Sequence, residues 1–113
     1  MEPGIEQAAS LFKVLGSEPR LWLLRLLSQE PRTVSELAET TSLSQPLVSQ
    51  HLRTLRQTGL ATARKEGRAV VYSLADEHVA HVIADALAHV QEPHAAEVAR
   101  TSSLTDTHER DLT

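Results

Sequence analysis

The sequence predicts a mainly α-helical domain with one β-hairpin, which forms a homodimer through its terminal helices. Apolar residues recur at steps of three and four along most of the chain, the period of amphipathic helices. Residues 60–74 instead place a Glu-Gly turn between two short β-prone runs, which is the pattern of a hairpin. The last helical segment, residues 76–92, carries an apolar stripe that a small domain cannot cover alone, so it predicts a partner chain.

The N-terminal part predicts two helices. Apolar residues at helical spacing over residues 5–15 define the first helix, which Gly16 ends. Ser17 can cap the second helix, and Pro19 fits its first turn, where the missing N–H costs nothing. This helix is apolar on most sides and is expected at the centre of the core, with Trp22 in core or dimer packing.

Two short helices joined by a tight turn are expected next. Thr33 and Glu36 have the spacing of a capping box, in which each side chain accepts a hydrogen bond from the other residue's backbone. The helix that they open should end near Thr40, and Ser44 should cap the following one. Such a pair is a helix-turn-helix, whose second helix lies in the DNA major groove of proteins that use it for recognition.

The second of these helices has an apolar and a polar face. The residues expected to face the core are Leu47, Val48, His51, Leu52 and Leu55. The opposite face is uncharged near the helix N-terminus and basic further on, so it suits base edges first and phosphates behind them. The DNA contacts expected from this helix and its cap are Ser44, Gln45, Pro46, Ser49, Gln50 and Arg53. In a dimer, two such helices imply a palindromic operator.

A basic hairpin follows once Gly59 has ended this helix. Its strands are expected at residues 60–65 and 68–74, with Glu66-Gly67 as the turn. The residues expected to face inward are Val70, Tyr72 and Leu74. The basic residues around the tip, which can reach a phosphate backbone, are Arg64, Lys65 and Arg68. A basic hairpin directly after a helix-turn-helix is a wing, so the predicted fold class is a winged helix-turn-helix.

The charge distribution supports contact with nucleic acid. The chain has a formal net charge of −4, which by itself argues against a polyanionic partner. Residues 44–72, however, carry five basic side chains against one acidic, a net charge of +4. A basic middle within an acidic chain is a localised electrostatic footprint for DNA.

Four potential metal ligands accompany the apolar stripe of residues 76–92. The stripe consists of Val79, Val82, Ile83, Ala86, Leu87 and Val90, and the ligands on its flank are Asp76, His78, His89 and Glu92. At about 100° per residue the two histidines share nearly one azimuth, but at about 1.5 Å rise they stand roughly 16 Å apart. Zinc takes such ligands at about 2.0–2.2 Å, so one helix cannot place all four around one ion.

Two antiparallel copies of this helix can complete the site. Across a two-fold axis, Asp76 and His78 of one chain would lie beside His89 and Glu92 of the other, and symmetry makes two identical sites per dimer. The same residues therefore predict both a dimer and a bound metal ion.

These motifs resemble the bacterial ArsR/SmtB metal-responsive repressors over roughly residues 5–94. The segments that carry the resemblance are residues 43–60, the hairpin 63–74 and the four ligand positions. It implies a dimeric repressor that holds operator DNA when metal-free and releases it on binding Zn(II), derepressing metal efflux or storage genes. In relatives of this type, the histidine at the His89 position bonds through its non-ligating nitrogen to a backbone carbonyl, which here would lie near Gly59.

Other readings remain open. Nickel or cobalt sensors of this family add ligands near the chain ends, and His81 and His94 lie close to the four ligand positions. A winged-helix regulator that senses no metal would use Asp76 as a helix cap and the other three positions as surface groups. A zinc enzyme is a less favoured interpretation, because four protein ligands would close the coordination shell that a catalytic zinc keeps open. We therefore expect a regulator and no enzyme.

The remaining features of the sequence predict the cellular compartment and the domain boundaries. The chain has no cysteine, which excludes thiolate metal sites. It shows no signal sequence and no apolar run of the roughly 20 residues that span a membrane, so a cytoplasmic protein without membrane contact is expected. Residues 1–94 are expected to form the DNA-binding and dimerisation domain. Residues 95–113 are polar and expected to be a disordered tail.

Overall fold

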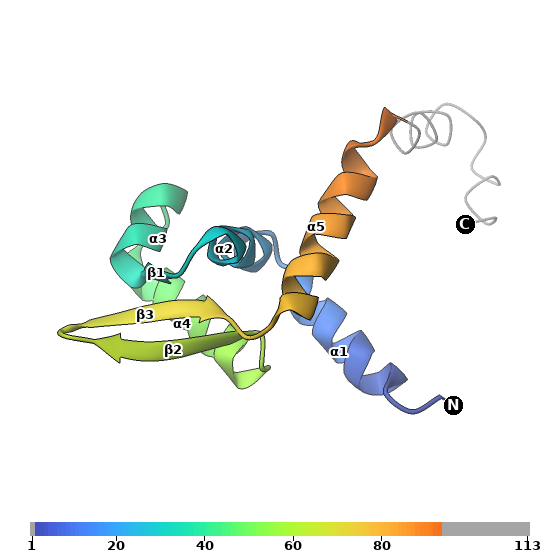
Figure 1. Cartoon of the computed structure of the whole chain (residues 1–113), viewed down its shortest axis with the longest axis horizontal. Helices are drawn as coiled ribbons and strands as arrows, with labels where there is room; N and C mark the ends of the chain where they lie inside the picture. Colours follow the sequence, from blue (N-terminus) through green and yellow to red (C-terminus); the bar gives the residue numbers. More distant parts are fainter. Residues whose placement is uncertain (1, 94–113) are drawn as a thin grey trace. The chain divides into compact units, whose positions relative to one another are not determined.

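The computed structural model describes residues 2–93 (Figure 1). Its elements are, in order, α1 (Ile5–Leu15), α2 (Glu18–Gln29), β1 (Arg32–Thr33), α3 (Val34–Thr41), α4 (Gln45–Gln57), β2 (Ala61–Glu66), β3 (Ala69–Leu74) and α5 (Glu77–Gln91). The chain divides into two compact units, one ending at Ile83 and one beginning at Ala84. His94 and the predicted tail, residues 95–113, lie outside the described residues. Mainly helical content with a β-hairpin confirms the predicted fold class.

Helices α2, α3 and α4 begin at the polar residues that the sequence predicted as caps. The hydroxyl oxygens of Ser17 and Ser44 each accept a hydrogen bond from the backbone N–H three residues on, at 3.4 and 3.3 Å. At the start of α3, the Thr33 hydroxyl accepts from the Glu36 N–H at 3.2 Å, and the Glu36 carboxylate accepts from the Thr33 N–H at 2.9 Å. These caps fix where α2, α3 and α4 start, and so fix the register of the helix-turn-helix.

The core is built around α2, as predicted. The fully buried side chains are Leu23, Leu24, Leu37, Val48, Leu52, Leu55, Leu60 and Ile83. Trp22 is 46% exposed, so it is not part of the core of the single chain, and its packing in a dimer stays a prediction. It lies about 100° around the helix axis from Leu23 and about 200° from Leu24, outside the arc that faces the core.

The recognition helix α4 packs against α2, α3 and β2. Val48, Leu52 and Leu55 are fully buried and His51 is half-buried, in agreement with the predicted inner face. Leu47 is 37% exposed, which corrects its assignment to that face. It lies about 100° from Val48 around the helix axis, beyond the edge of the buried row.

The three strands form an antiparallel sheet in the order β1-β3-β2. The sequence did not predict β1, which is two residues long and pairs Arg32 with Tyr72. The tight turn of the hairpin is Gly67–Arg68 instead of the predicted Glu66-Gly67, because Glu66 still pairs with Ala69. Gly67 has a φ of +60°, a backbone conformation that glycine adopts without a steric penalty.

Residues on the inward face of the hairpin become more exposed toward its tip. Cross-strand pairing places Tyr72 and Leu74 on the same face as buried Ala61, and both are half-buried. Val70 shares that face, as predicted, but it is 40% exposed. The hairpin extends past α3 and α4, so no core lies beneath its tip (Figure 1).

The helix α5 divides its apolar stripe between the chain and solvent. Val79 and Ile83 are buried within the chain, whereas Val82 is 37% and Val90 64% exposed. The prediction that the whole stripe faces a partner is therefore wrong for Val79 and Ile83. No helix in the part of the chain that the structure describes has the length and apolar character to cross a membrane.

Candidate nucleic-acid interface and metal-ligand residues

The outward face of α4 is available to a partner molecule. Ser49, Gln50 and Arg53 are exposed, and none of their side chains forms a hydrogen bond or ion pair within residues 2–93. Pro46 is exposed in the first turn of the same helix. Because a free amide and a free hydroxyl have donors and acceptors to offer, this face can hydrogen-bond base edges.

Ser44 and Gln45, at the start of α4, also have structural roles. The Ser44 hydroxyl accepts the capping hydrogen bond from Leu47 N–H. The Gln45 side-chain amide donates to the Ser35 hydroxyl of α3 at 3.4 Å, which leaves its carbonyl oxygen free. Gln45 therefore links the two helices of the helix-turn-helix, a role that its position alone did not reveal.

The basic wing residues differ in their surroundings. Lys65 and Arg68 are exposed and carry no ion pair within the described residues. Arg64 is held by Glu66, whose carboxylate oxygen Oε2 accepts from Arg64 Nε at 2.7 Å and lies 2.5 Å from Arg64 Nη2. The sequence predicted three equivalent cations and no ion pair among them, although residues two apart on a strand share a face.

His51 is fixed on the inner edge of α4. Burial lowers the pKa of its imidazole below 6.5, and the nearby Arg20 guanidinium lowers that pKa further. Arg20 is itself held by α1, because its Nε donates to the Val14 carbonyl at 3.0 Å. A neutral, half-buried His51 agrees with its predicted structural role.

Asp76 and His78 form one half of the predicted metal site. Asp76 Oδ1 caps α5 by accepting the Val79 N–H at 3.1 Å, and it lies 3.7 Å from His78 Nδ1. Two ligands of a tetrahedral zinc ion, each about 2.1 Å from the metal, lie roughly 3.4 Å apart. The carboxylate and imidazole are 54% and 97% exposed, and a carboxylate oxygen has a lone pair to spare beside the cap. This donor pair fits a zinc-type ion, and both residues stay accessible.

A hollow beside this pair adjoins the end of α4. Asp76 and His78 line it together with Gly59, the residue that follows the C-cap of α4. Its other walls are apolar: Leu11, Leu15, Leu60, Val79 and Val82. Groups that approach Asp76 and His78 from outside therefore come close to the backbone that leaves the recognition helix.

His89 and Glu92 form the other predicted pair. His89 is exposed in the last turn of α5, and Glu92 is exposed just after it, with its N–H donating to the His89 carbonyl at 3.3 Å. His81 is also exposed. Within residues 2–93 of one chain, no three metal-ligating side chains come together. A complete four-ligand site would need groups from a second chain.

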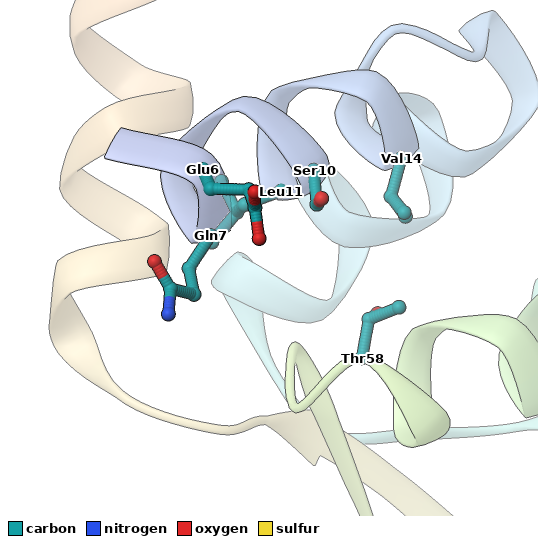
Figure 2. Close-up of a pocket in the computed structure, with 6 residues that line it drawn as sticks. All are labelled: Glu6, Gln7, Ser10, Leu11, Val14 and Thr58. Carbon is teal, nitrogen blue, oxygen red and sulfur yellow. The ribbon is translucent and has the colours of Figure 1, made fainter. Parts of the chain in front are cut away.

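A further hollow separates α1 from the C-terminal end of α4. Figure 2 shows Glu6, Gln7 and Ser10 of α1 on one side and Thr58 on the other. Thr58 is the C-cap of α4, and its hydroxyl donates to the Thr54 carbonyl in the last turn of that helix at 2.9 Å. This end of the recognition helix is consequently not packed tightly against α1.

A family model matches part of this chain. The family model described as "Bacterial regulatory protein, arsR family" matches residues 17–63, which run from the cap of α2 into β2. The match covers the helix-turn-helix and the first half of the wing strand. It does not include α5.

Several characterised proteins are similar over most of this chain. The transcriptional repressor SmtB of Mycobacterium tuberculosis is 40% identical over 88 residues, which are 78% of this chain and 65% of that protein. The cadmium resistance regulatory protein CadC homolog of Staphylococcus aureus is 39% identical over 85 residues, 74% of this chain and 70% of that protein. The transcriptional activator HlyU of Vibrio cholerae is 39% identical over 83 residues, 74% of this chain and 77% of that protein.

A solved structure shows the fold in a dimer. The homodimeric winged helix-turn-helix domain Mb0332 of Mycobacterium bovis, described as a possible ArsR-family regulator, superimposes with a TM-score of 0.72 at 31% identity. The superposition covers 83% of this chain and 92% of that domain.

Proposed function

Because this chain belongs to the arsR family of bacterial regulatory proteins, we propose that it is a homodimeric, metal-responsive transcriptional repressor. In this proposal the metal-free dimer binds a palindromic operator, and Zn(II) binding between the subunits releases the DNA. The observation that carries the proposal is the exposed, unbonded face of α4, which continues into a basic hairpin.

The DNA contacts divide by chemistry. Gln50 and Ser49 are free to pair with base edges, and glutamine can bond adenine through two atoms, a contact that discriminates by about 1–3 kcal/mol. Gln45 would offer its free carbonyl oxygen, and Ser44 and Pro46 would bring the start of α4 close to the groove. Arg53, Lys65 and Arg68 would hold phosphates, with Arg64 contributing once it leaves Glu66.

The dimer would form through the terminal helices α1 and α5. Both helices expose large apolar side chains: Ile5 at 45%, Phe12 at 59%, Val82 at 37% and Val90 at 64%. Such side chains are poorly placed in water, so a second copy that covers them stabilises the fold. The homodimeric state of the Mb0332 domain supports a dimer of this chain.

The metal site would be shared between the two chains. Asp76 and His78 of one chain and His89 and Glu92 of the other would supply two oxygen and two nitrogen ligands, a set that suits Zn(II). Bound there, the ion would link the two chains through coordination bonds to residues of both. The cadmium resistance function in the name of the CadC homolog supports a metal effector. Nickel or cobalt is the alternative, because His81 is close by and exposed.

Coupling to DNA would run through the hollow beside Asp76 and His78. A partner's His89 that reaches this pair would also come close to Gly59, whose backbone carbonyl could accept a hydrogen bond from its second ring nitrogen. Because α4 ends two residues earlier, a pull on this backbone would reposition the recognition helix. By linkage, metal and DNA must weaken one another's binding by the same factor, typically about 5- to 150-fold.

A second candidate is a regulator of the same fold that senses no metal. Asp76 already has a structural role as the cap of α5, and HlyU is named as an activator without reference to a metal. In that case Zn(II) would leave DNA binding unchanged.

The experiment is an operator-binding titration by fluorescence anisotropy, with and without Zn(II). We expect Zn(II) to weaken binding by the wild type and to have no effect on His89→Ala. His81→Ala is the matched control, since it removes an exposed histidine of the same helix and should keep the zinc response. Co(II) optical spectra distinguish a zinc-type sensor from a nickel or cobalt sensor, because intense d–d bands indicate four ligands and weak bands indicate six. A His89→Ala protein that still releases DNA on zinc addition would refute the proposed site.

A further inference from the structure

The wing carries its charges on two opposite faces. Ala61 is buried and Ala63 half-buried, so the face that they share with Lys65 is directed toward the core. Because side chains alternate along a strand, Arg64 and Glu66 lie together on the outer face. Arg68 follows the turn glycine, between the two strands.

The outer face therefore presents an ion pair in place of a free cation. Both Nε and Nη2 of Arg64 contact the single oxygen Oε2 of Glu66, at 2.7 and 2.5 Å. The two side chains are 57% and 54% exposed, so the pair remains within reach of a large anion. A phosphate group can use this edge of the Arg64 guanidinium only after it displaces the carboxylate, and the carboxylate then remains beside the phosphate as a like charge.

A displaced carboxylate lowers affinity for every DNA sequence equally. Phosphate contacts supply most of the binding to nonspecific DNA, while base contacts supply the discrimination. A wing with all its cations free would bind bulk DNA more tightly without binding an operator more selectively.

We propose that Glu66 restrains the hold of the wing on the phosphate backbone by occupying Arg64, and so limits nonspecific DNA binding. This inference rests on the proposed DNA-binding function. It assigns Glu66 as a residue that tunes the affinity for DNA of any sequence without itself contacting a base.

The test uses metal-free full-length protein and a labelled duplex of mixed sequence. Glu66→Gln keeps the size of the side chain and removes its charge. We expect it to bind about 2- to 5-fold more tightly per wing, the range of an exposed ion pair. The plot of log K against log salt should become steeper by about 0.9 per wing, or about 1.8 for a dimer, because each wing gains one phosphate contact.

Two controls separate this effect from a change in net charge. Glu30→Gln removes the same charge from the base of the hairpin, where Glu30 lies near Leu74 and Asp76, and should leave the salt slope unchanged. In an Arg64→Gln background, Glu66→Gln should no longer steepen the slope, because no cation is left to release.

Each remaining outcome is decisive. If the wild type binds the duplex and Glu66→Gln matches it in affinity and slope, the inference is wrong while the proposed function stands. Weaker binding by Glu66→Gln would mean that Glu66 itself contacts DNA, which also overturns the inference. If Glu30→Gln has the same effect as Glu66→Gln, the gain belongs to net charge. A wild type without salt-dependent DNA binding would overturn the proposed function and the inference together.

Discussion

Replacing Arg53 by glutamine should change the salt dependence of DNA binding by an amount that the structure sets. Among the predicted DNA contacts, three cations per protomer are free of any ion pair in the described residues: Arg53, Lys65 and Arg68. A dimer then offers six phosphate contacts, and at about −0.9 per contact log K should fall with log salt with a slope of about −5.4. Arg53→Gln removes two contacts and should reduce the slope to about −3.6.

These slopes translate into easily measured affinities. Between about 50 and 200 mM salt, the wild type should lose roughly 2,000-fold in affinity and Arg53→Gln only roughly 150-fold. Fluorescence anisotropy across a salt series measures both values. Arg25→Gln, an exposed charge change on α2, is the control and should keep the wild-type slope. An unchanged slope in Arg53→Gln would show that Arg53 does not contact phosphate, and a wild-type slope near −7 would show that Arg64 is already free.

Three further predictions concern stability and are measured by denaturant unfolding of the purified protein. Thr33→Ala removes the capping box with Glu36 and should lower the free energy of unfolding by about 1 kcal/mol, whereas Thr33→Ser should keep most of it, and equal loss in both would contradict the cap. Leu52→Ala leaves a cavity at a fully buried position and should cost about 2–5 kcal/mol; a loss below about 1 kcal/mol would contradict its place in the core. Because burial and Arg20 lower the pKa of His51 in the folded state, the unfolded chain binds the proton more tightly, so stability should be fully present above pH 6.5 and fall as the pH drops through the lowered value. His51→Gln should lose this component of the pH dependence, and a variant with the full wild-type pH profile would show that His51 does not cause it.

The local features of the fold could be predicted because short segments determine them. Ser17, Thr33 and Ser44 cap helices through bonds to residues three positions away, so their spacing was sufficient. By contrast, β1 is two residues long and exists only because β3 lies beside it, so no local pattern marked it. The exposure of Trp22 and Val70 likewise depends on where other elements end.

The predicted site residues likewise divide into those that the local sequence determines and those that depend on other groups. Arg53, Lys65 and Arg68 could be identified as accessible cations because they cluster in sequence around the helix-turn-helix and wing. The ion pair of Arg64 with Glu66 depends on side-chain conformation within one strand face, which the residue types permit but do not require. The pairing of Asp76 with His78 follows from their adjacency at the start of α5. Whether His89 and Glu92 complete their site depends on a second chain, and it remains a prediction.

Subunit mixing tests the shared metal site most directly. One variant would carry Asp76→Asn and His78→Ala, where asparagine preserves the cap of α5, and the other His89→Ala and Glu92→Gln. Neither homodimer should bind Zn(II) tightly or release DNA on zinc addition. After mixing, each heterodimer should regain one site with all four ligands, because the two intact pairs come from opposite chains. Recovery of one zinc ion per heterodimer together with zinc-dependent DNA release is the predicted result; mixed chains that bind no more zinc than the separate variants would contradict a site built from two subunits.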